Sequence, residues 1–263
     1  MKFSYFPGCT LKNKAKILDV YARKCAEVLG AELEEIENWQ CCGGVFTTAK
    51  DEVATKLSSV RILKEALRKE TDLVTVCSAC HNVVKQTNYA IQTDKEFAGK
   101  VNRYMAEDEY NGETKIYHYL ELLRDVIGFD KVKEKVVNSL NGKKVAAYYG
   151  CLLLRPNSVM RMDDPENPSI IEDLIRAIGG EAIVYPARNE CCGGYVRLES
   201  PELANKKSNN VFNSAMNAGA EVIVTACPLC KYNLEKSGCE IPVVYITELL
   251  ADALGVKEDA DEQ

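Results

Sequence analysis

The chain has 263 residues and a formal net charge of −6; 46% of its residues are hydrophobic and 27% are charged. This composition is typical of a folded globular protein with one large or two ordinary domains, and it excludes disorder and collagen-like structure. No run approaches the ~18 apolar residues that a membrane span requires, and the N-terminus lacks the apolar stretch of a signal peptide. We therefore expect a cytoplasmic protein without membrane insertion, and the acidic balance argues against general nucleic-acid binding.

The first half of the sequence alternates strand and helix patterns. β-rich apolar runs indicate the strands, and apolar residues at helical spacing indicate the helices. In chain order the sequence predicts a strand at Lys2–Phe6, a helix at Ala15–Leu29, a strand at Glu32–Ile36, a helix at Asp51–Arg68, a strand at Leu73–Val76 and a helix from about His81.

The second half repeats this order. Proline near the start of two helices and the pair Gly179-Gly180 after one of them support the predicted helix ends. The predicted elements are a strand at Val145–Tyr149, a helix at Pro168–Ile178, a strand at Ala182–Tyr185, a helix at Pro201–Ala218, a strand at Val222–Ala226, a strand at Val243–Tyr245 and a helix at Glu248–Leu254.

Alternating strands and helices predict an α/β fold in which mainly parallel sheets are flanked by helices. The Asn-Ser-Leu-Asn-Gly segment at Asn138–Gly142 interrupts the regular pattern, so we expect one domain at 1–142 and a second at 143–263. The first domain carries an insertion near 90–111, which could be a partner surface or a solvated extra helix. The second domain ends in an acidic tail at 257–263.

The strongest signal is a doubled cysteine pattern. Ten of the 12 cysteines follow the order C-x31-CC-x34-CxxC in the first half and C-x39-CC-x34-CxxC in the second. The first set comprises Cys9, Cys41, Cys42, Cys77 and Cys80; the second comprises Cys151, Cys191, Cys192, Cys227 and Cys230. Cys25 and Cys239 have no counterpart, and we expect them to be small apolar side chains in or near the core.

The cysteines predict a metal site rich in thiolates. Several follow directly after a predicted strand, and the carboxyl ends of parallel strands meet at one edge of a sheet, so each half should gather five thiols there. The chain has only 2 histidines, so the candidates are iron–sulfur clusters or Cys-only zinc. Disulfides and a thioredoxin-type CxxC are weaker alternatives, because a reducing compartment opposes the first and the second leaves three cysteines of each half unexplained.

These motifs resemble the CCG cysteine-rich domain family. Two such domains with little else are similar to the B-type subunit of heterodisulfide reductase from methanogens and related anaerobes. The resemblance covers Phe6 to about Leu254 and implies two CCG domains related by a pseudo-two-fold axis. It also implies two noncubane [4Fe-4S] clusters, one held by each set of five cysteines.

The resemblance further implies an activity and partners. The activity is reduction of the coenzyme M–coenzyme B heterodisulfide to two thiols in methanogen energy metabolism. The partners are two further subunits of heterodisulfide reductase, one of them ferredoxin-like and the other flavin-containing and responsible for electron bifurcation. A hydrogenase or formate dehydrogenase joins them in the larger complex.

Two other functions remain open. Similar doubled domains occur in electron-transfer subunits of lactate or glycolate and succinate or fumarate oxidoreductase complexes. The chain could also be a non-catalytic metal-binding scaffold.

An anionic heterodisulfide requires cations near the cysteines. Candidates near them in the sequence are Arg155, Arg161, Arg197, Lys231 and His81. We prefer Arg155 and Lys231 as substrate contacts. His81, which directly follows the first CxxC as Lys231 follows the second, could also donate a proton to a departing thiolate.

Overall fold

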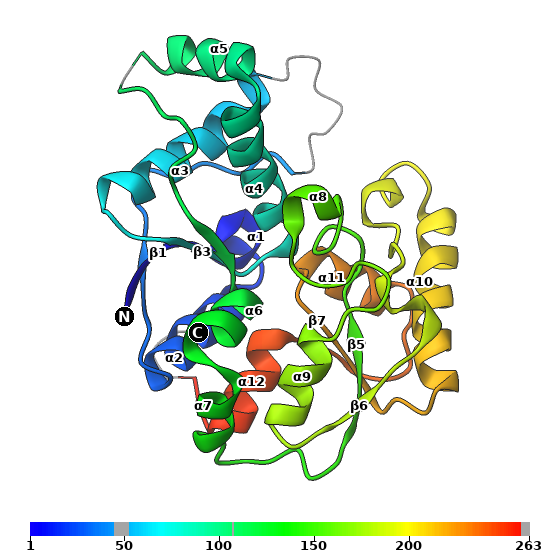
Figure 1. Ribbon diagram of the computed structural model, residues 1–263. Coiled ribbons are helices and arrows are strands. Elements are labelled where there is room, and N and C mark those ends of the chain that lie inside the picture. The colour runs from blue at the N-terminus through cyan, green and yellow to red at the C-terminus, as the bar shows by residue number, and fades with distance from the viewer. Residues whose placement is uncertain (45–52, 107, 259–263) are drawn as a thin grey trace.

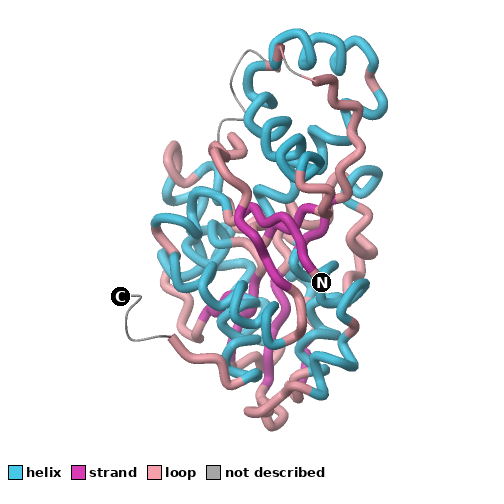
Figure 2. Tube along the Cα trace, turned by 90° about the vertical axis from the view of Figure 1, so that its left-hand side faces the viewer, coloured by secondary structure: helices cyan, strands magenta, loops and turns pink. Residues whose placement is uncertain are grey.

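The computed structural model describes residues 1–44, 53–106 and 108–258. The described chain has an α/β fold with parallel sheets flanked by helices, as predicted, and each of its two sheets has four strands (Figure 1). Figure 2 shows the strands in the middle of the molecule with helices on both sides. None of the helices in the described part of the chain has the length and apolar character needed to cross a membrane.

The first half contains the N-terminal sheet and its helices. Its elements are β1 (Lys2–Phe6), α1 (Gly8–Asn13), α2 (Lys16–Val28), β2 (Glu32–Glu35), a 3-10 turn (Ala54–Lys56), α3 (Leu57–Arg68), β3 (Leu73–Thr75), α4 (Ser78–Thr93), α5 (Lys95–Met105), β4 (Ile116–His118), α6 (Tyr119–Glu121), a π-helical segment (Leu122–Ile127) and α7 (Phe129–Glu134).

The second half contains the C-terminal sheet and its helices. Its elements are β5 (Lys144–Tyr148), α8 (Asn157–Met160), α9 (Ile170–Ala177), β6 (Glu181–Ile183), two 3-10 turns (Pro186–Asn189 and Gly194–Val196), α10 (Pro201–Asn217), β7 (Val222–Thr225), α11 (Pro228–Lys236), β8 (Val243–Tyr245) and α12 (Ile246–Leu254).

The two sheets have equivalent strand orders, β2-β1-β3-β4 and β6-β5-β7-β8, and every pairing is parallel. In each sheet the two central strands are the ones that lead to cysteines: β1 and β3 in the first, β5 and β7 in the second. Because the strands are parallel, these cysteines emerge at the same edge of their sheet. The topology thus gives a physical reason for each set of cysteines to gather.

The structure corrects the start of the helix predicted from about His81. Helix α4 begins at Ser78, with Cys77 in extended conformation (φ −93°, ψ 120°) just before it. Cys80 therefore lies in the first helical turn instead of ahead of the helix. In the second half α11 begins in the same way, with Cys227 extended and Pro228 at the first helical position.

Several other elements differ from the prediction, among them strand β4, which was not predicted. The helix predicted from Asp51 is preceded by a 3-10 turn and becomes α-helical only at Leu57, while 51–52 lie outside the described residues. Helix α1 was not predicted, because it has only 6 residues and no apolar period long enough to detect. It begins at Gly8, whose φ of +78° redirects the chain directly after β1.

One hydrophobic cluster spans both halves, and a second lies within the second half. The first cluster includes buried residues of α2 from the first half and of α12 from the second. These helices pack together, and the Thr247 hydroxyl donates to the Leu18 carbonyl at 3.0 Å. The first half also contains α5, for which the second half has no counterpart between α11 and β8; Figure 1 shows α5 at one end of the molecule. The division at 142/143 stays a prediction.

The CxxC loops of the two halves meet at the seam between the sheets. Ser78 of the first loop donates to the Ala226 carbonyl, which precedes the second loop, from its backbone N–H at 3.1 Å and from its hydroxyl at 2.7 Å. The buried Tyr245 hydroxyl lies 2.6 Å from the Val76 carbonyl oxygen and 2.9 Å from that of Ala226. One phenol therefore links the backbones that carry Cys77 and Cys227.

Replacing Tyr245 with phenylalanine should lower the free energy of unfolding by about 1–3 kcal/mol, because a buried carbonyl loses its donor. Chemical denaturation followed by circular dichroism measures this change. Tyr104→Phe is the matched control, since Tyr104 is 65% exposed on α5 and its variant should stay within about 0.5 kcal/mol of the wild type. Equal stability of the two variants would contradict the bridging role of Tyr245.

Candidate metal centres

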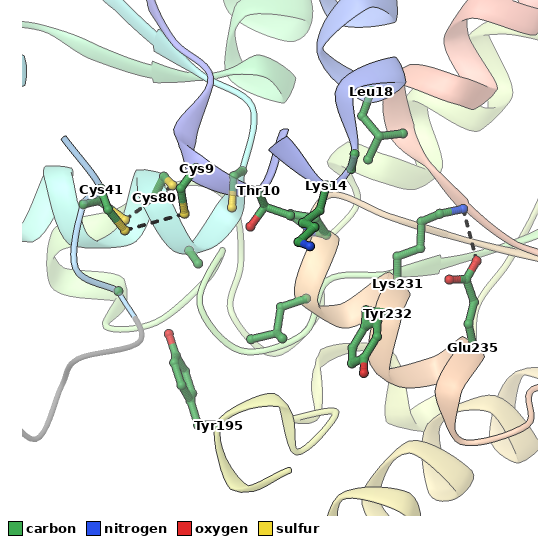
Figure 3. Close-up of a pocket in the computed structure, with 17 residues that line it drawn as sticks. Cys9, Thr10, Lys14, Leu18, Cys41, Cys80, Tyr195, Lys231, Tyr232 and Glu235 are labelled. Carbon is green, nitrogen blue, oxygen red and sulfur yellow. Dashed lines mark hydrogen bonds and ion pairs between the residues drawn. The ribbon is translucent and has the colours of Figure 1, made fainter. Parts of the chain in front are cut away.

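The first set of cysteines lines a cavity of about 440 Å³. Cys9 comes from α1, Cys41 and Cys42 from the loop after β2, and Cys77 and Cys80 from the start of α4. Apolar side chains form much of the remaining wall, among them Leu229 and also Leu18, which Figure 3 labels. The structure thus brings all five thiols of the first predicted set to one cavity.

The second set lines a smaller space of about 20 Å³. It contains Cys151, Cys191, Cys192, Cys227 and Cys230, in positions that follow β5, the loop after β6, and β7. Cys25 and Cys239 line neither cavity. Burial raises the pKa of Cys25 to about 12, which is the behaviour of an unreactive core thiol.

Tyr195 and Leu229 line both cavities. Tyr195 belongs to the 3-10 turn directly after the second Cys-Cys-Gly-Gly motif, and Figure 3 shows its hydroxyl directed toward the first set of cysteines. Burial and the nearby thiolates of both sets raise the pKa of Tyr195, so the phenol keeps its proton. The two cysteine sets are therefore neighbours separated by shared side chains.

Within each set the sulfur atoms lie in van der Waals or hydrogen-bond contact. Cys41 Sγ lies 3.6 Å from Cys9 Sγ, Cys42 Sγ lies 3.4 Å from Cys80 Sγ, and Cys192 Sγ lies 3.6 Å from Cys230 Sγ. These distances exclude disulfides, whose sulfurs are about 2.05 Å apart. All ten thiols are free.

Hydrogen bonds between thiols lower the pKa of Cys42 in the first set and of Cys191 and Cys227 in the second. Those with Cys41 and Cys80 lower the pKa of Cys42 to about 3, and those with Cys151 and Cys192 lower the pKa of Cys191 to about 2. The backbone N–H of Gly193 adds a hydrogen bond to Cys191 Sγ at 3.4 Å. Thiolate is the form that ligates metals, so each set contains a thiol that is already in the ligating form.

Glycines make room for the sulfurs. A Cβ at Gly8 would lie 2.7 Å from Cys80 Sγ, and a Cβ at the equivalent Gly150 would lie 3.1 Å from Cys230 Sγ. Both glycines have positive φ, at +78° and +65°, which also disfavours a side chain. The residue before the first cysteine of each set is thus a glycine because the last cysteine of that set packs against it.

The donor set fits an iron–sulfur cluster. Thiolates are the ligands of such clusters, and each cavity offers five. The backbone N–H of Gly43 hydrogen-bonds to Cys41, and that of Gly193 hydrogen-bonds to Cys191. Within the described residues, no group of three or more histidine, cysteine or carboxylate side chains is arranged to hold a single metal ion. The five thiols of the first set instead line the cavity of about 440 Å³ together.

The structure places His81 away from both cavities. Its ring is fully buried, with Nδ1 3.1 Å from the Thr75 hydroxyl and Nε2 3.4 Å from a carboxylate oxygen of Glu121. Burial, together with the neighbouring His118 and Lys85, lowers the pKa of His81 well below its usual range. The only two histidines of the chain pack edge to face there, so His81 is a neutral core residue.

Among the residues that the structure describes, Lys231 is the one predicted cation that lines either of the two cysteine cavities. Its ammonium group lies 3.3 Å from Glu235 and 3.0 Å from Glu248, and Figure 3 shows it turned toward Glu235. The pair Lys231–Glu248 occupies the position that His81–Glu121 occupies in the first half, since both acids are the third residues of their helices. Lys231 therefore has two acidic partners already.

The arginines lie outside both cavities. Arg155 donates to the carbonyls of Asn189 and Pro165 and to Glu166, and Arg161 donates to the Ser158 carbonyl. Arg197 is held in a half-buried network with Asn205, Asn233 and Ser237. These contacts are structural ones.

Sequence reasoning missed Lys14, Tyr195 and Asn233. Lys14 is exposed, lines the first cavity and forms no ion pair with the residues that the structure describes. The position of Tyr195 after Cys-Cys-Gly-Gly and that of Asn233 one turn after Cys230 were available signals. Lys14 gave none, because only the turn after α1 brings it to the cavity.

The chain matches the family described as "CCG: Cysteine-rich domain" twice, at residues 3–85 and 145–235. A protein from Archaeoglobus profundus that is named as similar to the B-type subunit of heterodisulfide reductase is 30% identical over 97% of this chain and 91% of that protein. The B-type subunit of the ferredoxin:CoB-CoM heterodisulfide reductase of Methanosarcina mazei is 29% identical over 98% of this chain and 91% of that protein.

A relative with another name is equally similar. The 8-methylmenaquinol:fumarate reductase membrane anchor subunit of Wolinella succinogenes is 30% identical over 97% of this chain and 93% of that protein. Among solved structures, a hypothetical protein from Helicobacter pylori has a TM-score of 0.73 at 11% identity, covering 98% of this chain and 49% of that chain, and shares the fold. The chain therefore belongs to the CCG cysteine-rich domain family, with two copies of the domain, and is a relative of the B-type subunit of heterodisulfide reductase over nearly its whole length.

Proposed function

We propose that this chain is the catalytic iron–sulfur subunit of a disulfide reductase acting on the coenzyme M–coenzyme B heterodisulfide. The observation that carries the proposal is the meeting of two five-thiol sets at cavities that share Tyr195 and Leu229. The relatives named as B-type subunits of heterodisulfide reductase support it.

The chemistry needs two electrons and two protons. Reduction breaks the S–S bond of R–S–S–R′ and gives R–SH and R′–SH. Two noncubane [4Fe-4S] clusters, when bound, would supply one electron each. One cluster in each cysteine set would therefore supply the two electrons that cleavage of the S–S bond requires. In this proposal the first is held by Cys9, Cys41, Cys42, Cys77 and Cys80, and the second by Cys151, Cys191, Cys192, Cys227 and Cys230.

The side chains of the first cavity bind the substrate. The apolar walls, including Leu18 and Leu229, exclude water from the S–S bond, while Lys14 at the exposed side attracts an anionic end. Tyr195 holds a proton on its hydroxyl within the cavity and is placed to donate it to a sulfur that gains charge. Lys231 forms ion pairs with Glu235 and Glu248, which neutralise its charge. Its main role is therefore to hold the cavity wall in place, and it attracts anions less than Lys14 does.

Electrons must come from other proteins. We propose two partner subunits, one ferredoxin-like and the other flavin-containing, with a hydrogenase or formate dehydrogenase in the larger complex. The relatives' printed names, which describe subunits of heterodisulfide reductases, support an assembly of several chains.

The fumarate reductase relative favours a second candidate function. In it the chain passes electrons between a quinol and a partner, as a CCG subunit of a fumarate-type complex, without binding a disulfide. Its cavities would then hold clusters only. A non-catalytic metal-binding scaffold is the third candidate.

Metal analysis and an assay separate the three candidates. Protein purified without oxygen should contain about eight iron atoms and eight acid-labile sulfides per chain, as expected for two four-iron clusters. With a viologen dye as electron donor, it should release two thiols per heterodisulfide. Thiol binding should also change the electron paramagnetic resonance spectrum. Iron with no thiol release and no spectral change would favour the electron-transfer candidate, and tightly bound zinc without iron would favour the scaffold.

Replacing Gly8 with alanine should remove about half of the iron, because the new Cβ displaces Cys80 Sγ while the second set is untouched. Iron and sulfide analysis of the purified variant measures this loss. Gly99→Ala is the matched control, since Gly99 lies on α5 with nothing within 4 Å of a Cβ, and its iron content should equal that of the wild type. Full iron content in the Gly8 variant would argue against Cys80 as a ligand.

Replacing Lys14 with alanine should raise the KM for the heterodisulfide about two- to fivefold with kcat little changed, because an exposed charge contributes about 1 kcal/mol or less to binding an anion. Steady-state kinetics at low and high salt measures the effect, which salt should diminish. Lys16→Ala, a nearby exposed lysine outside the cavity, is the control. If both variants behave like the wild type, Lys14 does not contact the substrate.

A further inference from the structure

We propose that Asn233 makes the two cysteine sets electronically different, by donating a hydrogen bond to Cys192 that raises the reduction potential of the second centre. The inference rests on the iron–sulfur part of the proposed function and not on the identity of the substrate.

The contact is direct and buried. Asn233 is fully buried on α11, and its Nδ2 lies 3.5 Å from Cys192 Sγ and 3.3 Å from the Cys192 carbonyl oxygen. An N–H donated to a ligand sulfur withdraws electron density from it. It therefore stabilises the more negative, reduced form of a cluster bound there.

The orientation of the Asn233 amide is fixed by Arg197. The guanidinium donates through Nε to Asn233 Oδ1 and is itself held by Ser237 Oγ at 2.7 Å and Asn205 Oδ1 at 2.9 Å. Because a guanidinium can only donate, the amide oxygen must face it, and the NH2 group must face Cys192. Arg197 is thus a positioning residue that acts through Asn233.

The first half has valine at the equivalent position. Val83 follows Cys80 by three residues, as Asn233 follows Cys230. Both side chains pack against the second glycine of the Cys-Cys-Gly-Gly motif: a Cβ at Gly44 would lie 3.4 Å from Val83 Cγ2, and a Cβ at Gly194 would lie 3.5 Å from Asn233 Nδ2. Valine has no side-chain N–H to donate, so position 83 cannot supply to the first set the hydrogen bond that Asn233 supplies to the second.

The matched positions define a reciprocal experiment. Anaerobic potentiometric titration with dithionite as one-electron reductant, followed by electron paramagnetic resonance, gives a midpoint potential for each centre. Asn233→Val should lower one midpoint, so that at fixed ambient potential the ratio of reduced to oxidised centre falls several-fold; a tenfold fall corresponds to about 59 mV. Val83→Asn should raise the other midpoint.

Controls separate this inference from folding and from the proposed function. Asn213→Val makes the same change at an exposed position on α10 and should leave both midpoints unchanged. Iron and sulfide analysis verifies that each variant holds both clusters. If Asn233→Val loses a cluster, the midpoint potentials of Val83→Asn test the inference instead. Unchanged midpoints in loaded variants would overturn the inference. Shifted midpoints in a protein that cannot reduce the heterodisulfide would uphold it and overturn the proposed function instead.

Discussion

The position of both cysteine sets depends on the contact between the two CxxC loops. Tyr245 and Ser78 bond to the backbone carbonyls that precede these loops, and all of the groups involved are buried. A buried carbonyl that lost its donor would remain unsatisfied, so these hydrogen bonds hold the two CxxC loops in a fixed relative position. The contact holds Cys77 close to Cys227 and brings two sites on separate sheets to neighbouring cavities.

The two halves have the same architecture because one α/β unit occurs twice. The side chains that differ between the two units lie near the cysteines. The sheets share strand order, and the glycines before Cys9 and Cys151 make room for a sulfur in the same way. The units differ in the side chains near the sulfurs: Val83 corresponds to Asn233, and His81 corresponds to Lys231. One buried neutral imidazole and one cavity-lining ammonium thus occupy matched places, so two nearly equal scaffolds present unequal surroundings.

Much of the fold followed from periodicity and spacing. Strands such as Val243–Tyr245 and helices such as Pro201–Asn217 lie where the pattern places them, because each buries one apolar face against its neighbours. The short helix α1 and the start of α4 did not follow. Their conformations are set by a glycine turn and by an extended cysteine at a sheet edge, which leave no periodic trace.

By itself the sequence determined that ten cysteines form two sets and that parallel strands would gather each set at one sheet edge. Only the tertiary structure decided which other side chains meet them. Lys14, Tyr195 and Asn233 reach the cysteine sets, whereas His81 and Arg155 turn to buried or loop partners. The physical reason is that the parallel topology fixes where the carboxyl end of each strand lies. The direction of a polar side chain depends instead on hydrogen-bond partners from distant parts of the chain.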